Sequence, residues 1–261
     1  MAAVYRNSAT AFRNRIGKPS FGPVTYRLRR GPSLLVDPGP HDVRQINEIW
    51  IDKAYALVDS FTPQPGWSVV DVGANKGIFS TWAAHHMKHG TILALEPDER
   101  SIGFARANLA QFPTVDIDLR RNAVAATDGT VELFVSEGAT GLTSLYGPKA
   151  GDGETRVPSG RSITAPCVTL TEILTEQRPD LVKIDVEGSE YDILMSTGVE
   201  VLSRVDRIVL EYDLRHPIRP EVTHLDLERH LRIAGFAVQR PPWRRLMFAT
   251  SKAVIQAAGK R

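Results

Sequence analysis

The chain has 261 residues, of which 42% are hydrophobic and 24% charged, and this balance is typical of a folded globular protein. It contains no apolar run long enough to cross a bilayer, so a membrane span is not predicted. The single cysteine, Cys167, cannot form an internal disulfide, so a reducing, cytoplasmic location is expected. The formal net charge of +2 is too small to indicate a nucleic-acid partner by itself.

The charge is unevenly distributed along the chain. No acidic residue precedes Asp37, whereas the same segment carries Arg6, Arg13, Arg15, Lys18, Arg27, Arg29 and Arg30. A basic segment of this kind is compatible with an organellar transit peptide or with an arm that binds an acidic partner. The preferred interpretation is a solvated and partly disordered N-terminus.

Residues 1–65 are predicted to form an N-terminal extension of basic arm, hairpin and helix. Hydrophobic residues around a Gly-Pro-Ser turn predict a short hairpin over 24–36. Apolar residues recur at helical spacing over 41–61, and the sequence TPQPG then ends the predicted helix.

Strand and helix patterns alternate after Gly66. Strands are predicted at WSVVDVG, TILALEP, VDIDLRRNAVA, TVELFVS, LVKIDVEG and DRIVLEYD, and one helix is predicted over 188–204. The alternation indicates right-handed βαβ units around a parallel sheet. FAVQR and RLMFATS are predicted to pair as an antiparallel hairpin at one edge. We assign 66–252 to one domain and 253–261 to a tail.

A segment rich in Gly, Ser and Thr interrupts this alternation over 138–161. A loop of that length is uncommon inside a compact domain and is usually functional or disordered. We predict a mobile, lid-like segment there, which together with the N-terminal helix shapes the acceptor pocket.

The stretch VVDVGANKG, residues 69–77, ends a predicted strand and begins a helix. Gly73 and Gly77 allow a sharp turn and a close backbone approach, and the helix offers free N–H groups to a ligand. Asp71 can accept hydrogen bonds from a ligand or hold the loop. Only G-x-x-x-G is present, so the complete dinucleotide fingerprint is missing.

Two acidic features follow at the same predicted edge of the sheet. Glu96 ends the next strand about twenty residues after the glycine loop, where a carboxylate can bind both ribose hydroxyls; Pro97 also suits a helix start. Asp185 and Glu187 close a later strand, and Glu211 closes the one after it. The carboxyl ends of parallel strands are where open α/β sheets bind ligands.

These motifs, in the order DVGANKG, LALEP, RNAVA, TGLTSL, VTLTEIL and KIDVEGSE, resemble the FkbM-type family of S-adenosylmethionine-dependent methyltransferases over about residues 48–250. The resemblance implies an α/β, Rossmann-like class I methyltransferase fold: a mostly parallel seven-stranded sheet with a reversed edge strand, to which this chain adds an N-terminal extension. It implies S-adenosylmethionine as cofactor, S-adenosylhomocysteine as product, and methylation of a hydroxyl on a sugar or other natural product.

The resemblance also places the cofactor-binding residues. They are Asp71, Gly73, Ala74, Asn75 and Gly77 around the methionine part, Glu96 with Pro97 at the ribose, Asn122 and Ala123 beside the adenine, Ser144 closing over the cofactor, and Asp185 facing the reacting methyl group. Lys76 departs from the family pattern, because such loops more often carry a hydrophobic residue there.

Methyl transfer to an aliphatic hydroxyl needs alignment and a base. Asp185, Glu187 and His216 are the candidate bases. No metal site is assigned: His85 and His89 lie four residues apart on a predicted helix but lack a third ligand. A variant in which the acidic residues hold Mg²⁺ is kept as an alternative.

Other functions remain open at this stage. The incomplete glycine fingerprint disfavours a nicotinamide-dependent oxidoreductase. The basic arm would suit a nucleic-acid-binding module or an RNA methyltransferase, but no DPPY or NPPY motif for base-amino methylation follows the fourth strand. The expected partner is a small-molecule or glycosylated acceptor rather than nucleic acid, and a homo-oligomer is left open.

Overall fold

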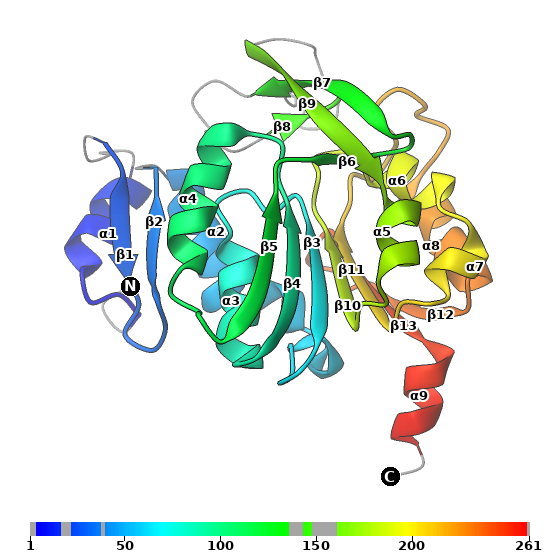
Figure 1. Ribbon diagram of the computed structural model, residues 1–261, viewed down its shortest axis with the longest axis horizontal. Helices are drawn as coiled ribbons and strands as arrows, with labels where there is room; N and C mark the ends of the chain where they lie inside the picture. The colour runs from blue at the N-terminus through cyan, green and yellow to red at the C-terminus, as the bar shows by residue number, and fades with distance from the viewer. Residues whose placement is uncertain (1–3, 17–21, 38–39, 136–142, 148–160, 260–261) are drawn as a thin grey trace.

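The computed structural model describes residues 4–16, 22–37, 40–135, 143–147 and 161–259. Its centre is a seven-stranded sheet in the order β12-β13-β11-β10-β3-β4-β5 (Figure 1). The strands are β3 (Ser68–Val72), β4 (Gly90–Leu95), β5 (Val115–Arg120), β10 (Leu181–Ile184), β11 (Arg207–Glu211), β12 (Phe236–Gln239) and β13 (Leu246–Ser251). Strand β13 runs antiparallel to both β11 and β12, while the pairs from β11 to β5 are parallel. The predicted fold class and terminal hairpin are confirmed, with the reversed strand one place in from the edge.

Helices cover both faces of this sheet. Neighbouring strand residues alternate between two hydrophobic cores, as Val69 and Val70 do, because successive side chains of a strand point to opposite faces. Burial on both faces explains the continuous hydrophobic runs in the sequence. One core includes residues of α2 (Pro40–Trp50) and α3 (Ile78–Met87), and the other includes residues of α5 (Leu170–Glu176), α6 (Glu190–Ser196), α7 (Val199–Leu202) and α8 (His224–Ile233). Helix α4 (Glu99–Leu109) packs beside α3 and β5.

A second sheet lies across the carboxyl end of the first (Figure 1). Its order is β6-β9-β7-β8, with β6 (Ala123–Ala125), β7 (Gly129–Val135), β8 (Thr143–Ser144) and β9 (Arg161–Thr169). The prediction of one strand over 115–125 is wrong, because the chain leaves the main sheet after Arg120 and β6 pairs with β9 instead. The predicted lid at 138–161 lies largely outside the described residues.

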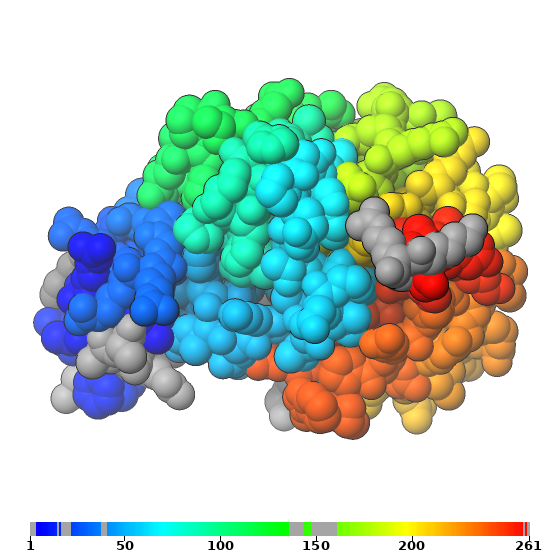
Figure 2. All heavy atoms as spheres, turned by 90° about the horizontal axis from the view of Figure 1, so that it is seen from below, coloured from blue at the N-terminus to red at the C-terminus, as the bar shows by residue number. Residues whose placement is uncertain are grey.

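The N-terminal extension is folded in its described part, which corrects the expectation of a solvated, partly disordered segment. It consists of α1 (Ser8–Arg15) and the hairpin of β1 (Val24–Arg27) and β2 (Ser33–Val36), as predicted for the hairpin. Tyr5 and Tyr26 are fully buried against each other, and the Tyr5 hydroxyl donates to Asn47 Oδ1 at 2.6 Å. Burial of these two rings holds the extension against α2, and it forms a lobe at one side of the molecule (Figure 2).

Two predicted helices are interrupted. The backbone N–H groups of Ile51 and Asp52 both donate to Asn47 O, and Lys53 then adopts a left-handed φ of 52°, so α2 ends at Trp50. The two short turns η1 (Ala54–Ala56) and η2 (Asp59–Phe61) follow it. The helix predicted over 188–204 divides into α6 and α7, and α9 (Lys252–Ala258) extends past the sheet at the C-terminal end. No helix in the described ranges has the length and apolar character required to span a membrane.

Candidate functional site

A cavity lies at the carboxyl ends of the central strands, between the second sheet and α2. Its void measures about 970 Å³, a figure that includes the solvent-filled space at its open mouth. The structure brings together on its wall many of the residues predicted from the sequence: Gly73, Asn75, Glu96, Pro97, Asn122, Ala123, Asp185 and Glu187. Asp71, Ala74, Gly77, Ser144 and His216 are not among the lining residues.

The two glycines of the loop after β3 are required by packing within the protein. A Cβ on Gly73, whose φ is 77°, would lie 2.0 Å from the Asp185 carbonyl oxygen, so the glycine lets the ends of β3 and β10 meet. A Cβ on Gly77, whose φ is 72°, would lie 3.1 Å from Ala105 Cα, where α3 packs on α4. Gly73 thereby shapes the cavity floor, whereas Gly77 serves helix packing.

Glu96 is the buried acid of the cavity. Its Oε2 accepts from the Asn75 N–H and its Oε1 from the Asp98 N–H, both at 2.8 Å. Burial raises its pKa to about 7, against the lowering effect of these two hydrogen bonds. Each oxygen retains a lone pair that can accept from a ligand hydroxyl.

The cavity wall also carries an unsatisfied acceptor. Asn75 is 7% exposed, and its side-chain Oδ1 is buried without a hydrogen-bond partner in the described part of the chain. A buried acceptor of this kind is costly unless a ligand or water donates to it. The lone pairs of Glu96 and Asn75 Oδ1 therefore fit a ligand with several hydroxyl or amino donors, as in the ribose and methionine parts of S-adenosylmethionine.

Asp71 lies under the loop. It is fully buried, accepts from Ser80 Oγ at 2.5 Å and forms an ion pair with Lys183 Nζ at 3.0 Å. Lys183 Nζ also donates to the Gly73 carbonyl at 2.7 Å. Burial alone would lower the pKa of Lys183, but the Asp71 and Asp185 carboxylates raise it overall. The geometry favours the second of the two predicted roles of Asp71, which is to hold the loop.

Four carboxylates gather at the other end of the cavity: Asp185, Glu187, Glu211 and Glu48. The Tyr55 hydroxyl donates to Asp185 Oδ2 at 3.0 Å. Glu211 lines the cavity and is exposed to solvent. Desolvation of its carboxyl group, followed by the charges of Asp185 and Glu187, raises its pKa well above the usual range. Burial also raises the pKa of Glu48. This acidic end can hold a proton or a positively charged group.

Helix α2 supplies a cavity wall whose residues were not predicted. His41, Arg44, Gln45 and Glu48 line the cavity at spacings of three and four, which place them on one face of the helix. The signal in the sequence that indicates them is the polar stripe of α2 beside its apolar stripe. Arg244, from the turn between β12 and β13, forms an ion pair with Glu48.

His216 is buried and does not line the cavity. Its Nδ1 accepts from the N–H groups of Ile218 and Arg219, both at 3.1 Å, and its Nε2 lies 3.1 Å from Asp192 Oδ1. Both ring nitrogens are therefore engaged in holding this loop, so the geometry does not support the predicted role of His216 as a base. Ser144 donates to the Glu187 carbonyl at 2.8 Å, and so contacts the cavity through that loop.

The other polar candidates also have local packing roles. The His85 ring lies 5.5 Å from the Trp50 ring, and the Cys167 thiol, buried in β9, donates to the Thr127 carbonyl. Among the residues that the structure describes, no three His, Cys, Asp or Glu side chains are grouped as metal ligands.

Comparisons with known proteins identify relatives of this chain, two of them named as methyltransferases. The chain is 26% identical over 217 residues to Methyltransferase 1 of Beauveria bassiana, covering 75% of this chain and 82% of that protein. It is 24% identical over 218 residues to Methyltransferase sdnD of Sordaria araneosa, covering 74% and 81%. It also matches AMB antimetabolite synthetase AmbE of Pseudomonas aeruginosa at 27% identity, covering 68% of this chain and 10% of that protein.

Among solved structures, magnesium protoporphyrin IX methyltransferase from Synechocystis PCC 6803 with bound SAM aligns with a TM-score of 0.43 at 13% identity, over 95% of this chain and 93% of that one. The sequence profile described as the Methyltransferase FkbM domain matches residues 71–238, which is more than half of the chain. The chain therefore belongs to the FkbM methyltransferase family, and its cofactor is S-adenosylmethionine, as predicted.

Proposed function

We propose that the protein transfers the methyl group of S-adenosylmethionine to a hydroxyl group of a small-molecule, sugar or natural-product acceptor. The observation that carries this proposal is the acidic end of the cavity, where the Tyr55–Asp185 hydrogen bond of 3.0 Å lies among further carboxylates. A hydroxyl acceptor needs a base, and a carboxylate can take its proton. The name of the relative AmbE, an antimetabolite synthetase, supports a natural-product acceptor.

In this proposal the cofactor lies along the strand ends. Glu96 accepts hydrogen bonds from the ribose hydroxyls, and Asn75 Oδ1 accepts from a donor on the same ligand. Asn122 and Ala123, at the start of the second sheet, border the adenine. S-adenosylmethionine supplies an electrophilic methyl group on a positively charged sulfur. We keep Asp71, Ala74, Gly77 and Ser144 as residues that support this site through the loops they hold.

The proposed bases are Asp185, Glu187 and Glu211. Asp185 is held by the Tyr55 hydroxyl, which orients its carboxylate. Glu211 has a raised pKa, which makes its carboxylate a stronger base than an ordinary glutamate. His41, Arg44 and Gln45 on α2 would contact the acceptor. A cytoplasmic location is kept as a proposal that rests on the single cysteine.

The test measures transfer of a radiolabelled methyl group from S-adenosylmethionine to a panel of hydroxylated sugars, polyketides and peptides. We expect label in a methyl ether product, a strong loss of turnover in Asp185→Asn or Glu211→Gln, and retained S-adenosylhomocysteine binding in both. Activity that survives a chelator would remove the Mg²⁺-assisted variant. Transfer only to nitrogen, carbon or nucleic acid would overturn the proposal.

A further inference from the structure

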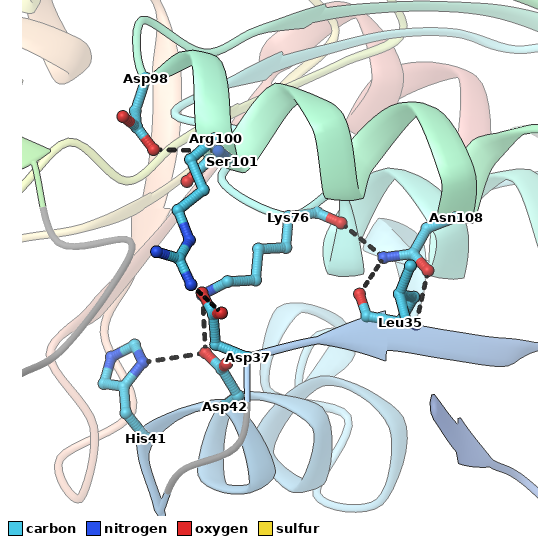
Figure 3. A network of polar contacts seen from close by, with 9 residues as sticks. All are labelled: Leu35, Asp37, His41, Asp42, Lys76, Asp98, Arg100, Ser101 and Asn108. Atoms are coloured by element: carbon cyan, nitrogen blue, oxygen red, sulfur yellow. Dashed lines mark hydrogen bonds and ion pairs between the residues drawn. The ribbon is translucent and has the colours of Figure 1, made fainter. Parts of the chain in front are cut away.

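Lys76 in the glycine loop is a buried lysine that reaches into the N-terminal extension. The side chain is 1% exposed, and its Nζ lies 2.9 Å from Asp42 Oδ1 and 3.8 Å from Asp37 Oδ2. Asp37 follows β2, Asp42 stands in the first turn of α2, and Arg100 of α4 contacts Asp37 at 2.5 Å. Figure 3 shows the four side chains converging between the loop, α2 and α4.

This network connects the cofactor end of the cavity to its α2 wall through neighbouring residues of one loop. The N–H of Asn75 donates to Glu96 at the cofactor end, while the next residue, Lys76, binds Asp42. The Nδ1 of His41 lies 3.5 Å from the same Asp42 carboxylate, and His41 lines the cavity. The loop therefore contacts two parts of the cavity wall. Asn75 binds the Glu96 carboxylate at the cofactor end, and Lys76 binds Asp42 of α2, the helix that forms another wall.

A second set of contacts, made by Asn108, connects the loop to the N-terminal extension. The Asn108 side chain of α4 donates to the carbonyls of both Leu35 and Lys76 and accepts from the Leu35 N–H (Figure 3). Because an unpaired buried charge is costly, Lys76 and Asp42 have few alternative positions once they are paired. A change in the loop is therefore passed to the first turn of α2.

We propose that Lys76 is a positioning residue, which fixes the α2 wall of the acceptor pocket relative to the cofactor loop and makes the order of α2 depend on cofactor binding. This inference rests on the proposed function, because it takes α2 as the acceptor wall. It gives a use to the residue at which this chain departs from the family pattern. The proposed role of Lys76 is to couple the cofactor site to the acceptor pocket, and it does not require Lys76 to bind either ligand.

The experiment measures hydrogen–deuterium exchange of the α2 amides with and without S-adenosylhomocysteine. In the wild-type protein we expect the ligand to slow exchange over residues 40–50 by about tenfold, in the range of ordinary coupling energies. In Lys76→Met this protection should fall to less than about threefold, while calorimetry gives an S-adenosylhomocysteine Kd within about fivefold of wild type. Asp42→Asn, which changes no side-chain size, is the second variant in case Lys76→Met fails to fold.

A matched control contacts the same extension. Gln111, in the turn after α4, binds the backbone of Ser33 through both side-chain amide atoms and does not contact Asp42, so Gln111→Ala loosens the hairpin and should keep the wild-type protection of α2. Equal protection in wild type and both Lys76 and Asp42 variants would overturn the inference, as would no protection in the wild type. Failure of the wild type to bind S-adenosylhomocysteine would instead overturn the proposed function and the inference with it.

Discussion

The cofactor end and the acceptor wall of the cavity are held in place by different kinds of interaction. At the cofactor end, strands β3, β4 and β10 place their ends side by side, and Glu96 is fixed by two backbone N–H groups. At the acceptor wall, α2 is fixed by side-chain ion pairs, Lys76 with Asp42 near its start and Arg244 with Glu48 near its end. Backbone hydrogen bonds therefore orient Glu96 in the first region, whereas ion pairs add to the apolar packing of α2 in the second, and substitutions should separate the two.

The two regions each depend on a buried lysine. Lys183 lies under the glycine loop with Asp71, and Lys76 leaves the same loop toward Asp42. Both side chains are at most 3% exposed. Removal of one partner of a buried pair leaves the other charge without compensation. We therefore expect loss of Lys183 to destabilise the whole edge of the sheet, and the effect of losing Lys76 to be confined to α2.

The largest expected effect is that of Lys183→Met. It leaves the fully buried Asp71 without its ion pair and removes the contact with the Gly73 carbonyl, so the free energy of unfolding should fall by about 3–5 kcal/mol. Urea denaturation followed by circular dichroism measures the change. The double variant Lys183→Met with Asp71→Asn is the control and should recover part of the loss. An unchanged denaturation midpoint in Lys183→Met would show that the pair does not hold the loop.

The next effect is that of Glu96→Gln on the cofactor end. The amide keeps the size of the side chain but loses the charge, and its NH₂ group replaces one of the two acceptor oxygens and so faces one of the two N–H donors. Hydrogen bonds to charged groups contribute about 1.5–3 kcal/mol, so the Kd for S-adenosylhomocysteine should rise by about 10- to 150-fold. Calorimetry measures it, and Gln111→Ala serves as the distant control. Wild-type affinity in Glu96→Gln would remove Glu96 from the site.

The difference between the regions also explains what could be predicted from sequence. Glu96, Asn75 and Asp185 are predictable because each follows a hydrophobic run directly, and parallel strands bring their ends to one edge. The polar stripe of α2 can be located in the sequence, because the buried residues Val43, Ile46 and Ile49 recur at helical spacing. That this stripe faces the cavity depends on the position of α2, to which the ion pairs with Lys76 and Arg244, far away in the sequence, contribute. Local pattern contains no information on such long-range pairs.

The same reasoning applies to His216 and the second sheet. His216 follows β11 in sequence, which suggested a place at the cavity edge, but the N–H groups of Ile218 and Arg219 turn its ring into its own loop. Strand β6 continues the hydrophobic pattern of β5, and only its pairing with the distant β9 separates the two. The position of each residue in the order of elements therefore does not give its place in the structure. For His216 the reason is hydrogen bonding within its own loop, and for β6 it is pairing with a strand far away in the sequence.

A pH titration tests the cofactor end more finely. The Glu96 carboxyl has a pKa of about 7 without ligand, and ribose hydroxyls donate better to the ionised form, so binding lowers this pKa and releases a proton. Affinity for S-adenosylhomocysteine should therefore rise with pH, by about tenfold between pH 6 and pH 8. Glu190, whose burial raises its pKa to about 8, also titrates nearby. The share of the pH dependence that comes from Glu96 is the share that disappears in Glu96→Gln. If the affinity of that variant depended on pH as it does in the wild type, Glu96 would not be the titrating group.

The smallest effect is expected from Tyr55→Phe, which acts on the acceptor side alone. Burial, then the neighbouring carboxylates, raise the pKa of Tyr55, so its hydroxyl stays a donor to Asp185 at any working pH. Loss of this hydrogen bond, worth about 0.5–1.5 kcal/mol, should lower kcat/KM for methyl transfer by about two- to tenfold and leave the Kd for S-adenosylhomocysteine unchanged. Tyr146→Phe is the matched control, because it also removes a hydroxyl bound to a carboxylate, that of Asp192, outside the cavity lining. If both variants lost activity equally, the effect would be one of general stability, and Asp185 would not need Tyr55 to orient it.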